Sequence, residues 1–165
     1  MEQRIKPAGV YGYLGRHLFR MACKSDSDAY IYHTENKDLI EKYKFKAIRY
    51  PFLKKIFYEL EAPRNTGIRA FEVRSYAKYQ GFDLFIDNSD DKELVVAPLD
   101  EVSFFKVYPR KIWHKGWYDS RESRFEISVE EVTDIWEERT PIEGFKFDVE
   151  PIVYLKKDGV WLVEH

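Results

Sequence analysis

Cysteine and long apolar runs are almost absent from this chain. Its 165 residues include one cysteine, Cys23, which cannot close a disulfide within the chain. The opening residues, MEQRIKPAGV, lack the apolar centre of a secretory signal. No stretch approaches the roughly 18 apolar residues that a membrane-spanning helix requires. Together these absences favour a protein of the reducing cytoplasm that neither crosses nor binds a membrane.

Motifs that hold metals, cofactors or nucleophiles are also missing. The four histidines, listed here, have no partner at metal-ligand spacing: His17, His33, His114 and His165. The acidic run 26–28 begins like a calcium loop, but position 12 of such a loop would be Lys37 instead of glutamate. Cys23 falls on the apolar alternation of its segment, which predicts a buried, inert thiol. The sequence therefore predicts no cofactor, no metal and no catalytic residue, and a protein that is not an enzyme.

Aromatic residues are plentiful. They make up 17% of the chain, with 12 Tyr, 12 Phe and 4 Trp, while the net charge is −2. Aromatic side chains favour strands and bury large areas, so we expect sheet to dominate. The slightly acidic balance excludes the chain-wide basic coat typical of nucleic-acid-binding proteins.

The segment 75–96 repeats an earlier pattern. A shift of 63 positions places Tyr76 on Tyr13 and Phe82 on Phe19, and apolar positions again meet apolar positions. Each copy reads as a strand segment, an acidic turn and a returning strand. The two strand segments of the first copy are 10–23 and 29–34, and those of the second copy are 70–87 and 94–97. The repetition indicates an internal duplication of a hairpin–helix unit.

Further elements follow from periodicity and capping. Helices are predicted at 36–43, where Asn36 is the cap, at 51–60 after Pro51, and at 129–138, where Ser128 and Glu131 form a capping box. Strands are predicted at 44–50 and, from the alternation of Phe145 with its neighbours, at 145–149. KKDG near the C-terminus predicts a hairpin turn with VWLV as its return.

These elements predict an α+β fold, mainly an antiparallel twisted sheet of hairpins with a few short helices. Residues 1–165 are read as a single domain, within which 8–66 and 67–142 are tandem units and 144–164 is a C-terminal hairpin. Whether the units form one sheet or two is left open, and so is the oligomeric state.

Two neighbouring segments carry opposite charge. Residues 104–124 combine a net charge of +4 with aromatic side chains, among them Trp113, Trp117 and Tyr118. Residues 126–151 carry nine acidic against two basic residues. On a helix over 129–138 the following acidic side chains would form one strip, away from the apolar face: Glu130, Asp134, Glu137 and Glu138. The strip and the three aromatic residues are the candidate partner-binding residues.

A small, cofactor-free, aromatic-rich α+β chain with the acidic segment VEEVTDIWEER resembles the immunity proteins that neutralise bacterial polymorphic toxins. The resemblance implies a cytoplasmic bacterial protein that binds a cognate toxin domain, and the acidic strip would favour a partner with a basic surface. Two alternatives stay open. The basic-aromatic segment 104–124 could bind single-stranded nucleic acid, which the overall charge disfavours, or the chain could be a small-ligand-binding or enzymatic module.

Overall fold

The computed structural model describes residues 4–24, 28–90, 92–99 and 124–163. The chain forms two compact units, each built from separate segments. Unit 1 comprises Met1–Ala8, Val73–Arg139 and Glu150–His165, and unit 2 comprises Gly9–Glu72 and Thr140–Val149. Within the described residues the strands pair almost entirely antiparallel, and one α-helix and one 3-10 turn accompany them. The predicted antiparallel sheet is thus confirmed. The sequence predicted a few short helices, whereas the described residues contain one α-helix.

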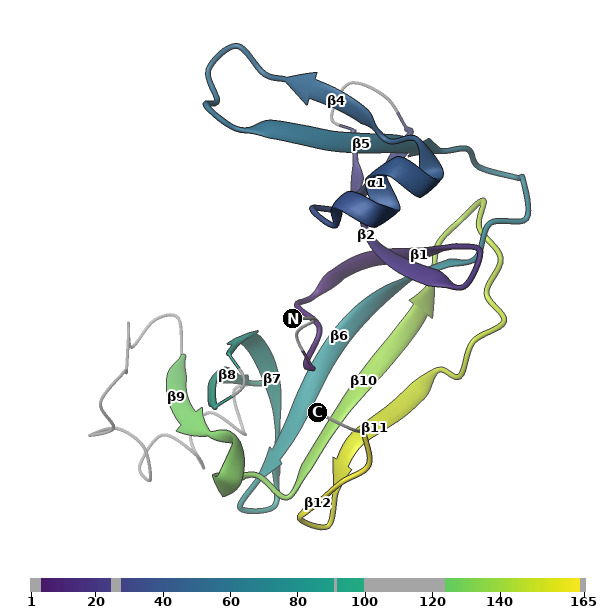
Figure 1. The fold of residues 1–165 in the computed structure, drawn as a ribbon. Coiled ribbons are helices and arrows are strands. Elements are labelled where there is room, and N and C mark those ends of the chain that lie inside the picture. Colours follow the sequence, from purple (N-terminus) through teal and green to yellow (C-terminus); the bar gives the residue numbers. More distant parts are fainter. Residues whose placement is uncertain (1–3, 25–27, 91, 100–123, 164–165) are drawn as a thin grey trace. The chain divides into compact units, whose positions relative to one another are not determined.

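Unit 2 is a five-stranded antiparallel sheet with a helix on one side (Figure 1). The strand order is β1-β2-β3-β5-β4. The bounds are β1 Gly9–Leu14, β2 His17–Cys23, β3 Tyr30–His33, α1 Lys37–Tyr43, β4 Lys46–Arg49 and β5 Ile56–Ala62. Since β4 is the last strand in this order, one of its edges has no strand partner among the described residues.

Helix α1 begins where its sequence predicted. The Asn36 side chain accepts hydrogen bonds from the backbone N–H groups of Asp38 and Leu39, at 3.0 and 3.2 Å. These bonds satisfy amides that have no partner inside the helix. Lys44 ends the helix in the left-handed region, at φ 58°. Ile40 and Leu39 then pack on the unit 2 core.

The helix predicted at 51–60 is wrong. This stretch contains the loop after β4 and most of β5, which pairs with β4 on one side and with β3 on the other. Its apolar residues also fit a two-residue period, because Ile56, Tyr58 and Leu60 share one face of the strand. Pairing with two neighbouring strands outweighed the helical spacing of the same residues.

The core of unit 2 surrounds Tyr32, which has no exposed surface. Phe19, Met21, Phe45 and Ala62 are buried with it. The Tyr32 hydroxyl donates a hydrogen bond to the carbonyl oxygen of Tyr13 at 2.9 Å. Burial disfavours the phenolate and raises the pKa of Tyr32 to about 12.

Tyr32 should make the stability of unit 2 depend on alkaline pH. Folding raises the pKa of Tyr32 from 10.0 to about 12. The contribution of its protonated hydroxyl to the free energy of unfolding is therefore complete below pH 10 and is lost as the pH rises towards 12. One pKa unit corresponds to about 1.4 kcal/mol, so we expect a loss on the order of 2 kcal/mol across this window. Urea unfolding can be followed by NMR of the Met21 methyl group. The Tyr32→Phe variant should show a clearly smaller loss, and an equal loss would contradict the assignment.

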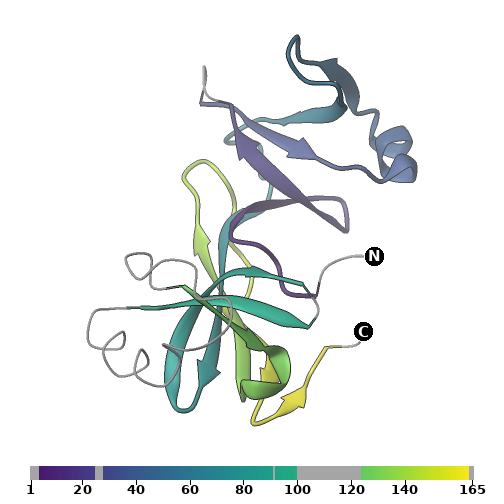
Figure 2. The same cartoon turned by 90° about the vertical axis from the view of Figure 1, so that its left-hand side faces the viewer.

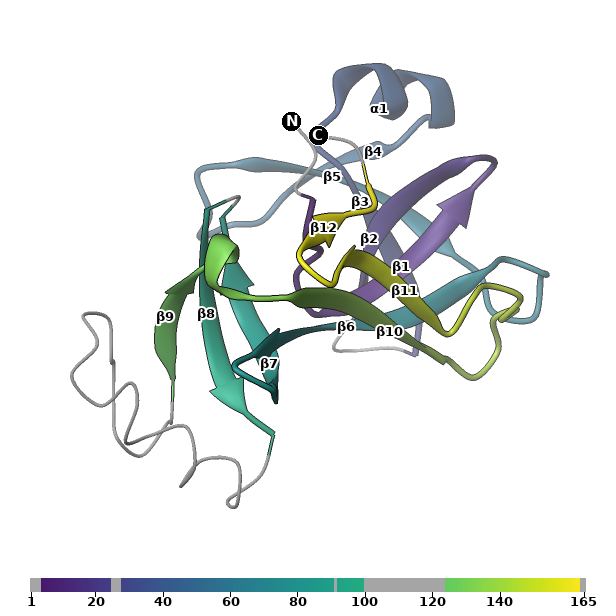
Figure 3. The same ribbon diagram turned by 90° about the horizontal axis from the view of Figure 1, so that it is seen from below.

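Unit 1 contains the strand order β12-β11-β10-β6-β7-β8-β9. The bounds are β6 Ala70–Tyr79, β7 Phe82–Ser89, β8 Glu93–Pro98, β9 Phe125–Ser128, β10 Asp134–Pro141, β11 Ile152–Lys157 and β12 Val160–Trp161. Figure 2 shows the teal strands of this unit side by side, and Figure 3 shows β7, β8 and β9 next to one another and β10 beside β11. Between the two groups lies one apolar core, to which Leu84, Leu94, Phe125 and Ile135 contribute.

The acidic tip of the β7–β8 hairpin is a turn, as its composition predicted. The Asp90 carboxylate accepts hydrogen bonds from the backbone N–H groups of Lys92 and Glu93, at 2.8 and 2.7 Å. These bonds stabilise the charged form and lower the pKa of Asp90. Asp90 thus uses its carboxylate to close the turn.

The helix predicted over 129–138 is also wrong, although its first turn was identified correctly. Ser128 and Glu131 form the predicted capping box. The 3-10 helix η1 extends over Val129–Glu131 and ends at Val132, whose backbone is extended. From Asp134 onward the chain is strand β10, which lies between β6 and β11. The β-branched and aromatic residues that follow the turn favour this strand.

The C-terminal elements are predicted partly correctly. Strands β11 and β12 pair around the turn at Asp158 and Gly159, which confirms the KKDG hairpin. The strand predicted at 145–149 is wrong, because this segment forms one isolated parallel bridge, between Arg69 and Lys146. The Phe145 ring instead packs edge-on against Tyr30, with 5.3 Å between ring centres.

The predicted duplication has a counterpart in the topology. Strands β1-β2-β3-β5 and β6-β7-β8-β9 are both four-stranded antiparallel series, each with an insertion before its fourth strand. The registers differ, since Tyr13 pairs with Leu18 whereas Tyr76 pairs with Phe85. Common ancestry of the two halves therefore stays a prediction.

Candidate functional site

A groove in unit 2 opens where two neighbouring strands separate. Strand β5 pairs with β3 only as far as His33 and Glu59, while its pairing with β4 continues to Ile56. Beyond His33 the chain leaves the sheet and enters α1. Residues 56–58 therefore have a strand partner on one side and face the groove on the other. Such a strand edge can accept an additional strand.

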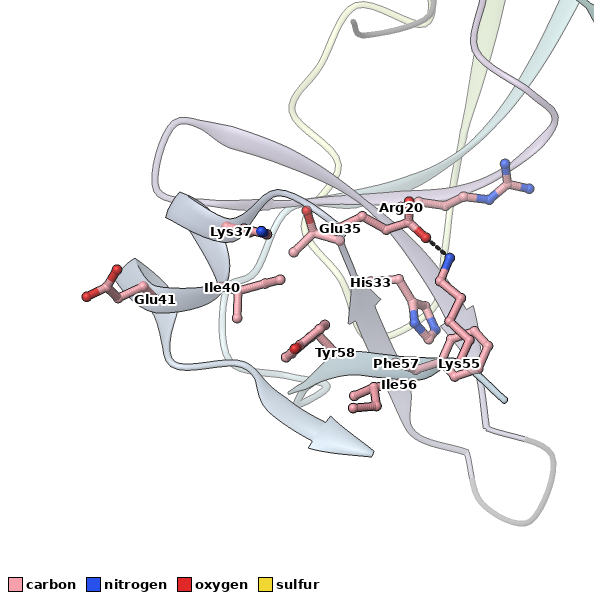
Figure 4. Close-up of a pocket in the computed structure, with 11 residues that line it drawn as sticks. Arg20, His33, Glu35, Lys37, Ile40, Glu41, Lys55, Ile56, Phe57 and Tyr58 are labelled. Carbon is pink, nitrogen blue, oxygen red and sulfur yellow. Dashed lines mark hydrogen bonds and ion pairs between the residues drawn. The ribbon is translucent and has the colours of Figure 1, made fainter. Parts of the chain in front are cut away.

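The groove has a volume of about 650 Å³. Figure 4 shows its lining residues, which come from the end of β3, from α1 and from the start of β5. Ile40, Ile56, Phe57 and Tyr58 supply apolar surface. A concave, partly apolar surface beside an unpaired strand edge has the features of a peptide-binding groove.

The rim of the groove is charged. Lys55 forms an exposed ion pair with Glu35 across one end (Figure 4). Arg20, Lys37 and Glu41 also line the groove. Since exposed ion pairs contribute little to stability, the Glu35–Lys55 pair can open at low cost when a ligand enters.

The loop between β4 and β5 exposes apolar side chains beside this groove. Phe52 is 97% exposed and Leu53 is 52% exposed. From Lys46 to Tyr58 the sequence has four basic residues and no acidic residue. The loop and its flanking lysines are called the hairpin tip (residues 49–56) below. Its exposed apolar side chains surrounded by positive charge form a candidate interaction surface.

The structure does not bring the predicted acidic residues together on one strip. Along β10 side chains alternate between faces, so Glu137 points away from Asp134 and Glu138. Asp134 accepts a hydrogen bond from the Asp158 backbone N–H at 2.9 Å, and Glu138 accepts one from the Trp136 indole at 3.2 Å. Glu130 lies in η1 and is exposed. The helical strip of four acidic residues is therefore not formed, and the binding of a basic partner by these residues stays a prediction.

Glu137 has a structural role in unit 1. It has no exposed surface. Lys6 donates to its Oε1 at 3.0 Å, and Arg139 Nη2 donates to its Oε2 at 3.2 Å. The Ser75 hydroxyl holds the Lys6 segment by donating to the Lys6 carbonyl oxygen at 3.1 Å. Both carboxylate oxygens thus have a cationic partner, which offsets the cost of burial.

The remaining sequence-based candidates have different outcomes. Trp113, Trp117 and Tyr118, together with the rest of 104–123, lie outside the described residues. Cys23 is exposed, so the prediction of a buried thiol is wrong. Phe19 and Met21 on the same strand are buried, but β2 ends at Cys23, where the strand has passed the core.

Sequence reasoning missed both the groove and the hairpin tip. The groove depends on the register of β3 and β5, which no local pattern encodes. The tip could have been noticed, since YPFLKK places Pro51 in a loop and exposes the residues after it. Interpreting the same residues as the apolar stripe of a helix concealed that signal.

No cluster of metal-ligating side chains is found among the described residues. In the same residues, no helix combines the length and the apolar character needed to cross a membrane. A scan against protein-family models, a search of curated proteins and a search of solved structures each found no match to this chain. The groove and the hairpin tip are therefore the features of this chain that bear on its function.

Proposed function

We propose that this chain is a non-catalytic protein-binding module whose partner docks on the hairpin tip and the adjoining groove of unit 2. The exposure of Phe52 beside the unpaired edge of β5 is the observation that carries the proposal. A fully exposed phenylalanine is unfavourable in water and becomes an anchor when a partner covers it. A module of this kind suits an immunity protein that neutralises a cognate toxin domain in the bacterial cytoplasm.

The basic character of the tip favours an acidic partner segment. Arg49, Lys54 and Lys55 are exposed within the tip, beside its apolar side chains. Complementary charge accelerates association, while burial of the apolar anchors slows dissociation. The partner is therefore expected to present an extended segment with acidic and apolar residues, in place of the basic surface that the sequence suggested.

The groove adds a second mode of contact. An extended segment entering it can form backbone hydrogen bonds with residues 56–58 of β5, as in β-strand addition. Main-chain bonds contribute affinity in this mode, and the side chains of Ile40 and Tyr58 would select residues of the segment.

The test compares one double variant with one control variant in pull-downs from the native host. Phe52→Asp/Leu53→Asp should reduce affinity for the retrieved partner at least thirtyfold, because buried apolar anchors each contribute roughly 2 kcal/mol or more. Ile152→Asp is the matched control, since Ile152 is also 52% exposed but lies on β11. The control should bind normally. A partner lost equally from both variants would contradict docking at the hairpin tip.

Amide hydrogen exchange tests the groove separately. Alternate amides within 56–58 should exchange rapidly in the free protein and become protected when the partner is bound. Protection confined to other strands would exclude β-strand addition at β5. If the partner gene encodes a toxin domain, co-expression should restore growth with the wild-type chain and fail with Phe52→Asp/Leu53→Asp.

A further inference from the structure

Unit 1 buries a lysine, Lys156, that has no carboxylate partner among the described residues. Lys156 on β11 is 3% exposed. Its ammonium donates one hydrogen bond, to the carbonyl oxygen of Val129 at 3.0 Å, and lies 5.6 Å from the ring centre of Trp161. Among the described residues, no carboxylate lies within ion-pair distance of it. An ammonium has three donors, so two of them have no acceptor in this part of the chain.

This arrangement contrasts with the other buried charge of the unit. Glu137 has a cation on each carboxylate oxygen. A buried charge without an opposite charge is unfavourable, so an anion that enters beside it gains a favourable partner. Lys156 is thus a candidate for contact with an anion.

Lys156 lines a pocket of about 480 Å³. Two further cations, Arg4 and Lys92, line the same pocket. The Arg4 guanidinium lies over the Trp161 ring, with 3.8 Å between its carbon and the ring centre. The Trp161 indole therefore contacts Arg4 and Lys156, and it places both cations at one wall of the pocket.

The fold holds these side chains in place. Lys156 and Trp161 are direct partners across the β11–β12 hairpin, so they share one face of it. The hairpin turn is fixed by two backbone donors, since Asp158 donates to the Asp134 carboxylate and Gly159 donates to the Thr133 carbonyl oxygen. A pocket whose cations are held before binding loses little entropy when an anion enters.

We propose that this pocket binds a small oxyanion, a phosphate or carboxylate group, through Lys156 and Arg4. Lys92 adds positive charge at the entrance. Glu93 and Glu130 also line the pocket and are exposed. Their negative charge repels an extended polyanion such as nucleic acid, so the ligand is a free ion or a metabolite with a single anionic group.

The test titrates the full-length protein with sodium phosphate, and separately with acetate, at constant ionic strength adjusted with chloride. The Trp161 indole N–H signal in NMR spectra should shift and saturate. Saturation with phosphate alone identifies a phosphate site, and saturation with acetate alone identifies a carboxylate site. Glucose 6-phosphate then distinguishes free phosphate from a phosphate ester. A wild-type Trp161 signal that shifts with none of these anions, or shifts without saturating, overturns the proposal.

Two neighbouring lysines provide the control. Lys156→Gln should weaken anion binding at least tenfold, while Lys157→Gln, an exposed residue on the same hairpin, should leave it unchanged. Equal losses in both variants would indicate diffuse charge attraction and contradict the proposal. Arg4→Gln is the second site variant, which keeps the test decisive if Lys156→Gln fails to fold. The affinity of Arg4→Gln for the anion should also fall several-fold. An unchanged affinity would contradict the proposed contact between Arg4 and the anion.

Discussion

Replacing Lys6 and Arg139 together by methionine is expected to lower the free energy of unfolding of unit 1 by about 3–5 kcal/mol, the usual cost of leaving a buried ion without its partner. Both cations contact Glu137, whose carboxylate has almost no access to water. Methionine keeps much of the apolar volume of each side chain. The loss of stability therefore measures the effect of removing the two positive charges. Urea unfolding followed by tryptophan fluorescence measures it, since Trp136 and Trp161 belong to this unit.

Two further variants distinguish the effect of losing the buried ion pairs of Glu137 from the effect of removing any surface charge. Lys78→Met removes an exposed ion pair with Asp83 and should cost less than about 1 kcal/mol. Adding Glu137→Leu to the double variant should recover most of the lost stability, because an apolar replacement of the whole cluster leaves no buried charge. A double variant no less stable than Lys78→Met would show that Glu137 is hydrated or neutral in the folded protein.

Glu137 also shows where the sequence was informative and where it was not. The pattern VEEVTDIWEER fits a helix, and its capping box does start a helical turn. Position 137 nevertheless lies in a strand, since β6 and β11 offer hydrogen-bond partners on both sides of it. Long-range pairing is invisible to local periodicity. A residue assigned to an exposed acidic strip is therefore a buried ion-pair partner.

Elements specified by local chemistry were predicted well. Asn36 caps α1, Asp90 closes a turn, and Gly159 allows the positive φ of the last hairpin. The candidate sites, in contrast, arise from non-local geometry. The groove requires the offset between β3 and β5, and the Lys156 pocket requires β11, η1 and the N-terminal segment to meet. No spacing in the sequence encodes either arrangement.

Replacing Gly12 by valine is expected to destabilise unit 2 by about 3 kcal/mol, at the upper end of the usual cost of overpacking a core. A Cβ at this position would lie 2.3 Å from the Met21 sulfur and 3.2 Å from a ring carbon of Tyr32. Both neighbours are buried, so the Met21 side chain must repack within the core to admit the larger side chain. Gly12→Ala should cost less, because the sulfur lies near the end of a flexible side chain and can shift in part. Urea unfolding followed by circular dichroism measures both variants.

A double-mutant cycle with Met21→Ala identifies the cause. Met21→Ala alone should destabilise by about 2–5 kcal/mol, since it opens a cavity in the core. If the Gly12 effect arises from the sulfur contact, Gly12→Ala should cost much less in the Met21→Ala background, because the new methyl group then enters the vacated space. Equal costs in the two backgrounds would assign the effect to Tyr32 or to the strand backbone. Glycine at position 12 is thus required by the close approach of the Met21 side chain over β1, a constraint that follows from the packing of unit 2 and from no feature of the neighbouring sequence.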